Sequence, residues 1–226
     1  MKRTTILLLQ VIFLVLPFVY LLYVWPQLPA QVPMHYGGDN QPDRFGDKSE
    51  MLTTQLVLSL VGIGISALVL YVDKIDPKQK LSGDNPLTRK ISWTIVGLIA
   101  TLSIYTIFIT VRYTPTAPQS NALSAKGIEI IVCLFFSILG NFIANVKPNY
   151  FIGVRVPWTL ENPENWRRTH RLTGKLWFWG GLVLGVILLV VSSNYSIWIM
   201  LPGIFVLSLV PIVYSFLLFQ KSKTTK

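Results

Sequence analysis

The side chains of this sequence best suited to chemistry are histidine, arginine and asparagine in two loop segments. Asn149, Arg155 and His170 fall in one of them, where the guanidinium could hold a phosphate and the imidazole could transfer protons. No partner carboxylate is evident for them, and the sequence has no phosphate-binding glycine loop, HExxH pattern or Ser/His/Asp grouping. We therefore predict that the protein is not an enzyme, and keep an enzyme acting at the lipid headgroups as an alternative.

Metal ions and cofactors are not expected. The two histidines, His35 and His170, fall in different loops, so a zinc site is not indicated. The single cysteine, Cys133, lies within an apolar run and cannot form an intramolecular disulfide, so we expect it to pack among other side chains.

The composition predicts an integral membrane protein. Of the 226 residues, 52% are hydrophobic and 13% are charged, and the apolar residues form long runs. The expected fold is all-α, a polytopic bundle of six transmembrane helices. The predicted spans are 4–25, 52–72, 91–111, 127–146, 176–192 and 197–219. We expect the first to be a retained helix, because it is too long for the apolar part of a signal peptide and no clear cleavage site follows.

The distribution of basic residues predicts that both chain ends are cytoplasmic. Of the 20 Lys and Arg residues, 16 fall at the termini and in connections on one side of the predicted membrane, and four on the other. The net charge of +10 is then explained by contact with anionic lipid headgroups. The lipid bilayer is accordingly a predicted partner, and nucleic acid is not.

The outer segment 26–51 is rich in proline and turn-forming residues. Four prolines and a Gly-Gly-Asp-Asn stretch favour extended or turning chain over helix. It could be a structural lid or a docking surface for a ligand outside the cell. The outer contact candidates are Pro29, Val32, Pro33, His35, Asp43 and Arg44.

The inner segment 147–175 combines aromatic, basic and amide residues. Asn162 and Pro163 predict a helix start that leads into the fifth span, with Trp166 and His170 on one face and Glu164 pairing with Arg168. The segment could lie in the headgroups as an anchor or form a platform for a cytosolic partner. The inner candidates are Asn141, Asn145, Asn149, Gly153, Arg155, Pro157, Trp158, Thr159, Trp166, Thr169 and His170.

Polar residues in the fourth span leave a transporter or channel open as an alternative. Glu129 lies near its outer end, close enough to the interface to be solvated, and Asn141 and Asn145 lie near its inner end. Amide groups there usually face the bundle interior. In the fifth span, Gly181 and Gly185 predict close packing against another helix of the same chain.

The chain divides into three predicted parts. Residues 1–51 comprise the first span and the outer segment, 52–126 the second and third spans, and 127–226 a core of three spans with the inner segment.

Two sets of motifs carry a family resemblance. The outer stretch, with Leu28-Pro29, Val32-Pro33, His35 and Pro42-Asp43-Arg44, is similar to a bacterial membrane domain of uncharacterised function. The inner stretch resembles the core of the SdpI family of bacterial immunity proteins. Its matching residues are Gly140-Asn141, Asn145, Lys147-Pro148-Asn149, Phe151, Gly153, Arg155, Pro157-Trp158-Thr159-Leu160, Trp166, Thr169-His170 and Gly174-Lys175.

The resemblance implies a multi-pass protein of the bacterial cell membrane that confers immunity. It implies protection against a secreted peptide toxin, and a relay of toxin presence to a small ArsR-like repressor held at the inner face. The expected partners are therefore the toxin outside and the repressor inside.

Overall fold

Six long helices form the body of the protein in the computed structural model, which describes residues 1–76 and 82–224. The long helices are α1 (Arg3–Val24), α2 (Ser49–Leu70), α3 (Pro86–Val111), α4 (Pro118–Ile143), α6 (Pro163–Val190) and α7 (Ser193–Thr224). The short elements are η1 (Trp25–Gln27), β1 (Gln31–Tyr36), β2 (Pro42–Asp47), η2 (Val72–Lys74) and α5 (Pro157–Glu161). Lys78, Lys80 and Lys226, which contribute to the predicted charge asymmetry, lie outside the described residues.

All six long helices are long and apolar enough to cross a membrane. Their most apolar stretches have mean hydropathies between 1.7 and 2.6, yet no more than 33% of each stretch is buried inside the protein. Large apolar side chains such as Leu8 and Val190 point outward instead. Because this surface needs an apolar solvent, the predicted six-helix membrane bundle is confirmed.

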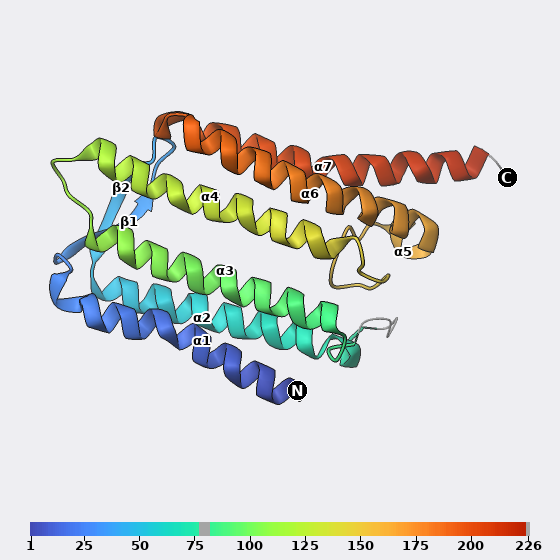
Figure 1. The fold of residues 1–226 in the computed structure, drawn as a ribbon, viewed down its shortest axis with the longest axis horizontal. Helices are drawn as coiled ribbons and strands as arrows, with labels where there is room; N and C mark the ends of the chain where they lie inside the picture. Colours follow the sequence, from blue (N-terminus) through green and yellow to red (C-terminus); the bar gives the residue numbers. More distant parts are fainter. Residues whose placement is uncertain (77–81, 225–226) are drawn as a thin grey trace.

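The helices form two groups of three (Figure 1). Helices α1, α2 and α3 pack against one another, as do α4, α6 and α7, and α3 with α4 joins the groups. In the first group Gln10, Ser66 and Ser92 form a buried hydrogen-bonded cluster across the three helices. Hydrogen bonds of this kind hold helices together where lipid offers no polar partner.

The connection between α1 and α2 contains a β-hairpin, so the predicted extended chain is confirmed. Strands β1 and β2 pair antiparallel, with a register irregularity between Pro33 and His35. Asn40 closes the turn with a φ of 60°, a conformation that asparagine tolerates better than most residues. Val32 is fully buried against Leu21 of α1 and Ile107 of α3, which fixes the hairpin to the bundle.

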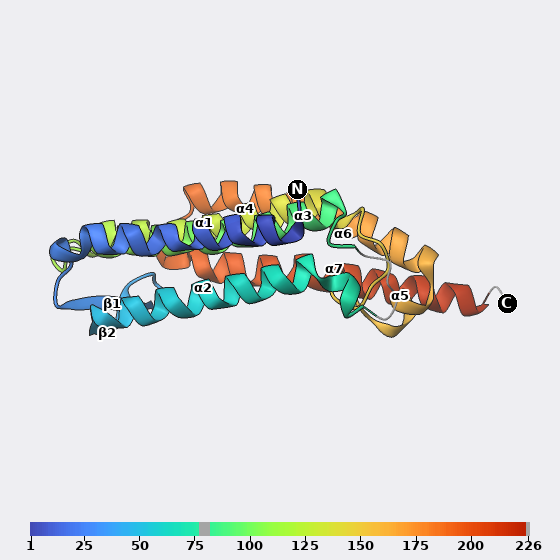
Figure 2. The ribbon, with the colours of Figure 1, turned by 90° about the horizontal axis from the view of Figure 1, so that it is seen from below.

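The hairpin and α5 lie at opposite ends of the bundle (Figure 1, Figure 2). We call these the hairpin end and the loop end. Both chain termini lie toward the loop end, as six successive crossings require. Which end faces the cytoplasm stays a prediction from the charge count, and so does the three-part division of the chain.

Helix α6 begins as the sequence predicts. The Asn162 side chain accepts hydrogen bonds from the backbone N–H groups of Glu164 and Asn165, and Pro163 occupies the first turn. The helix runs without a break through Trp166 and His170 into the fifth span. The predicted pairing of Glu164 with Arg168 is wrong, because Arg167, one residue closer, binds that carboxylate through two N–H groups.

Candidate functional site

A pocket of about 460 Å³ opens at the hairpin end, between the hairpin turn and helices α4 and α7. Its wall includes Tyr36, Gly38, Asn40, Glu129, Ile197 and Trp198. We call it the hairpin pocket. The pocket lies between the two groups of helices. The hairpin turn belongs to the connection between α1 and α2 of the first group, and α4 and α7 belong to the second group.

A buried carboxylate lies in this pocket. Glu129 is only 4% exposed, so the expectation that it would be solvated is wrong. Asn40 Nδ2 donates to Glu129 Oε1 at 2.7 Å, and Ser196 Oγ donates to the same oxygen at 2.9 Å. Asn40 Nδ2 also lies 2.9 Å from the Ser193 carbonyl oxygen. One asparagine side chain therefore connects the hairpin turn to α4 and α7.

The second oxygen of this carboxylate, Oε2, has no hydrogen-bond partner among the described residues. The other buried charge nearby, Lys126 on the preceding turn of α4, donates to the Val191 carbonyl oxygen at 2.5 Å. No ion pair joins Lys126 to Glu129 in the described structure. A buried carboxylate oxygen without a donor is costly, which makes this atom a candidate ligand contact.

The predicted outer residues have different surroundings. Val32 and Pro33 are buried in the bundle, whereas Pro29 is exposed. His35 Nδ1 and Asp43 Oδ1 lie 2.6 Å apart across the hairpin, and both line the hairpin pocket. Arg44 pairs with Glu50 at 2.6 Å. His35 and Asp43 are therefore the two predicted outer residues that the structure places at the site.

Asn40 and Ser196 were not among the sequence candidates, and Glu129 was considered only as a polar residue of the fourth span that could line a transport path. The turn-forming Gly-Gly-Asp-Asn stretch indicates a tight turn, and a carboxylate in an apolar span indicates a polar contact. Nothing in the spacing joins positions so far apart in the chain.

A second cavity of about 320 Å³ lies on the other side of β1, toward α2 and α3. His35, Tyr36 and Ile128 line both cavities. Gln55 Oε1, buried in the second cavity, also lacks a partner among the described residues. Burial, with a contribution from Tyr113 and Tyr105, raises the pKa of Tyr36 to about 12, so its phenol keeps its proton at neutral pH.

At the loop end, Asn149 forms the centre of the chain reversal after α4. Its side chain is fully buried and donates to the carbonyl oxygens of Lys147 and Ile152 at 2.8 and 2.9 Å. Its Oδ1 accepts from the N–H groups of Phe151 and Ile152, both at 2.7 Å. All the capacity of this amide is used to hold the loop, so Asn149 has no free group for a ligand.

His170 is a structural residue of the same loop. Its Nδ1 lies 2.9 Å from the Trp166 carbonyl oxygen, and its Nε2 accepts from the Val154 N–H at 3.0 Å. The predicted shared face with Trp166 is confirmed, because the two rings stack with centroids 3.9 Å apart. Gly153 has a φ of 118°, and a Cβ there would lie 2.1 Å from His170 Nε2.

Four further inner candidates form hydrogen bonds within the protein itself. Thr159 Oγ1 contacts the backbone of Val154 and Val156, and Thr169 donates to Asn165. Trp158 Nε1 donates to Ser215 Oγ of α7 at 2.9 Å. Arg155 donates to the Tyr150 carbonyl oxygen at 2.6 Å but stays exposed, as does Pro157.

The exposed part of the loop end is strongly basic. Arg155, Arg167, Arg168 and Arg171 are all exposed there. The expectation that Asn141 and Asn145 face the bundle interior is wrong, because both side chains are exposed. Helices α4 and α6 approach closely at Gly140 and Gly174, and Asn141 lies beside this contact on the outer surface. Asn141, Arg171 and Lys175 line a cleft of about 260 Å³ there.

Close packing at Gly181 follows the prediction for the fifth span. A Cβ at Gly181 would lie 2.5 Å from the Cys133 carbonyl oxygen of α4. Cys133 itself is fully buried, as expected.

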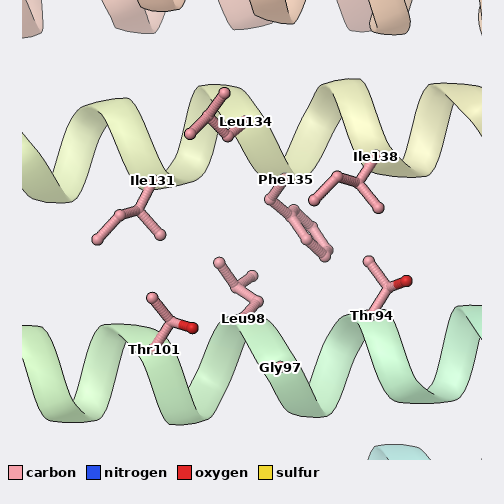
Figure 3. Close-up of a pocket in the computed structure, with 8 residues that line it drawn as sticks. All are labelled: Thr94, Gly97, Leu98, Thr101, Ile131, Leu134, Phe135 and Ile138. Carbon is pink, nitrogen blue, oxygen red and sulfur yellow. The ribbon is translucent and has the colours of Figure 1, made fainter.

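Figure 3 shows a cavity of about 330 Å³ between α3 and α4. Its lining is Thr94, Gly97, Leu98, Thr101, Ile131, Leu134, Phe135 and Ile138. It has no ionisable side chain, so it offers neither an ion site nor a proton-transfer group. Glu129, Asn141 and Asn145 do not line one cavity, because the first lies in the hairpin pocket and the other two are exposed elsewhere. Within residues 1–76 and 82–224 no three His, Cys, Asp or Glu side chains group as metal ligands do.

The fold and its lipid-facing surface define a multi-pass membrane protein. Residues 145–215 match the SdpI/YfhL protein family, and residues 12–58 match a domain of unknown function, DUF1648. The chain is 26% identical over 201 residues to Immunity protein SdpI of Bacillus subtilis (strain 168), covering 89% of this chain and 88% of that protein. The resemblance to the SdpI family is thereby confirmed, and with it a place in the cell membrane.

A second relative matches a shorter part of the chain. An uncharacterized protein of Archaeoglobus fulgidus is 36% identical over 67 residues, which is 30% of this chain and 34% of that protein. No solved structure matches the chain.

Proposed function

We propose that the protein protects the cell membrane against a secreted peptide toxin, which it contacts at the hairpin end. The similarity to Immunity protein SdpI runs through 89% of the chain and carries this proposal. The charge count predicts that the hairpin end faces outside. The hairpin pocket is then open to a ligand that arrives from there.

We further propose a relay to a cytosolic ArsR-like repressor at the loop end. The buried motif residues hold the loop rigid, so the partner would contact the exposed basic residues. Ligand binding at the hairpin end would have to favour one arrangement of the bundle over another. The Asn40 hydrogen bonds support a coupling at the hairpin end, because they tie the hairpin to α4 and α7, and both helices extend toward the loop end.

A killing assay tests the toxin role. The protein is produced in Bacillus subtilis cells from which SdpI has been removed, and these cells are grown beside the toxin-secreting parent. We expect survival close to that of cells that keep SdpI. Complete killing, with the protein verified in the membrane, contradicts the proposed toxin role.

The relay is tested separately by microscopy. A small ArsR-like repressor fused to a fluorescent protein should move to the membrane when toxin and this protein are both present. An Arg167→Gln/Arg168→Gln variant should lose recruitment and keep protection. Recruitment that is unchanged in this variant contradicts a basic docking surface at the loop end.

The proposal is for a binding protein and not for an enzyme. Asn149 and His170, which an enzyme at the headgroups would use, both have their hydrogen-bonding groups occupied by the loop. Overproduction is accordingly expected to leave the lipid composition of the membrane unchanged.

A further inference from the structure

The hairpin pocket contains an incomplete electrostatic site. Asn40 and Ser196 both donate to Glu129 Oε1, while Oε2 has no donor among the described residues. The carboxylate is 4% exposed, so bulk water does not replace the missing donor. A group that brings a donor to Oε2 would satisfy this atom.

The ionisable lining of the pocket favours a positive ligand. The lining contains two carboxylates, Asp43 and Glu129, and one imidazole, that of His35, which pairs with Asp43. Lys126, the buried cation on the preceding turn of α4, is not part of the pocket lining, and one of its N–H groups donates to the Val191 carbonyl oxygen. No other basic side chain lines the pocket within the described residues.

The rim of the pocket adds an aromatic face. Trp198 of α7 is 68% exposed and lines the pocket. It lies against the hairpin turn at Gly38, where a Cβ would be 3.0 Å from the indole ring. An indole ring binds both the methylene stem of a long side chain and the cation at its end.

An inorganic cation fits this lining less well. Metal ions such as Ca²⁺ require six to eight oxygen ligands, and the described residues contain no cluster of three His, Cys, Asp or Glu. An ammonium or guanidinium carries several N–H donors and needs only one carboxylate with an aromatic neighbour.

We propose that the hairpin pocket binds an organic cation, the ammonium or guanidinium group of a peptide ligand, with Glu129 Oε2 as its counter-charge and Trp198 against its stem. This inference deepens the proposed function and rests on it, because it gives the chemistry of the group that the toxin would insert. It also assigns Asn40 and Ser196 a positioning role. Their donation to Oε1 fixes the carboxylate and leaves Oε2 as the oxygen that still lacks a donor.

The test uses n-butylguanidinium chloride as the probe and the full chain in phosphatidylcholine nanodiscs. The seven tryptophans are replaced by 5-fluorotryptophan, and the Trp198 fluorine resonance is assigned by its loss in Trp198→Phe. We expect a saturable shift of this resonance. In Glu129→Gln, which has nearly the same shape but no charge, binding should weaken about 10- to 100-fold.

Three controls separate charge recognition from other effects. Uncharged butyramide should leave the Trp198 resonance in place, and so should sodium chloride at equal ionic strength. Glu161→Gln, the same change at an exposed carboxylate of the loop end, should bind the probe as the unchanged protein does. Unchanged fluorine resonances of the other tryptophans establish that Glu129→Gln is folded.

Equal affinity of Glu129→Gln and the unchanged protein would overturn the inference. A shift of the same size with butyramide or sodium chloride would do so as well. If Glu129→Gln does not fold, the unchanged protein is titrated with butanoate instead. Binding of this anion as tight as that of n-butylguanidinium would contradict a site that selects cations. If the protein binds n-butylguanidinium but does not protect cells from killing, the cation site stands and the toxin role is contradicted. If it protects cells but does not bind the probe, the toxin role stands and the cation site is contradicted.

Discussion

The polar side chains of the motif at the loop end have a structural role, because they form hydrogen bonds with the backbone of the loop. The buried Asn149 side chain satisfies four backbone groups of the turn after α4, and His170 Nε2 accepts a hydrogen bond from the Val154 N–H. Such groups are costly to leave unpaired at the edge of a membrane. The variety of residue types in the motif therefore reflects the variety of backbone groups that the loop must satisfy.

Gly153→Ala should destabilise the protein. Its φ of 118° disfavours any side chain, and the new Cβ would overlap His170 Nε2. We expect a loss of about 2 kcal/mol or more, seen as a lower midpoint of thermal unfolding in detergent. Gly64→Ala in α2 is the matched control, because nothing lies within 4 Å of its Cβ position and the change should be neutral or favourable. Equal midpoints for the two variants would contradict the close approach at Gly153.

At the scale of elements, the helices could be predicted, but most contacts between them could not, and Gly181 predicted a close contact without identifying its partner helix. The spans follow from apolar runs of sufficient length, and the start of α6 follows from Asn162 and Pro163. The prolines of the hairpin indicated extended chain, but strand pairing depends on a register that no local pattern specifies. Asn141 and Asn145 were placed inward by a general rule for polar residues, but both side chains are exposed, because the rule does not say which face of a helix packs against its neighbour.

Asn40→Gly should free the hairpin turn from the bundle. Glycine keeps the positive φ of 60° and removes the side chain that binds Glu129 and Ser193. We expect hydrogen exchange of the turn amides to become about tenfold faster, while exchange in α2 stays the same. Asp39→Asn on the exposed side of the turn serves as the control. Unchanged exchange in Asn40→Gly would mean that the apolar contacts of Val32 alone hold the hairpin.

Acid should weaken the attachment of α1 at the loop end. Arg3 binds Asp73 and Asp84, both at 2.6 Å. Burial raises the pKa of Asp73, but hydrogen bonds from Arg3 and the Gly83 N–H outweigh it, and the net pKa is lowered. The Arg3 hydrogen bond also lowers the pKa of Asp84.

The sign of this effect follows from the direction of both pKa shifts. Carboxyls whose pKa is lower in the folded state stabilise it above their ordinary pKa of about 3.9, and this stabilisation is lost as the pH falls below that value. The thermal midpoint should therefore drop as the pH falls from about 4 toward the lowered pKa values of the folded state, and it should drop less in Arg3→Gln. A drop of equal size in that variant would exclude the Arg3 contacts as its cause.

For the whole molecule, the orientation in the membrane decides which end meets which partner. A single cysteine is placed at Asp39 or at Arg168, in a Cys133→Ala background. A membrane-impermeant maleimide added to intact cells should label position 39, and should label position 168 only after the cells are opened. The opposite pattern would invert the predicted topology and place the hairpin pocket inside the cell.

The arrangement of the six helices in two groups has a practical consequence for work on this protein. One family match, residues 12–58, falls in the first group and the other, residues 145–215, falls in the second. The connection between α3 and α4 can therefore be cut without interrupting a helix, and two co-expressed fragments would each keep three complete spans. Association of the fragments would restore the packing of α3 against α4 and the hydrogen bond from Asn40 to Glu129. A split fluorescent reporter fused to the two fragments would therefore report formation of the interface between the groups in living cells.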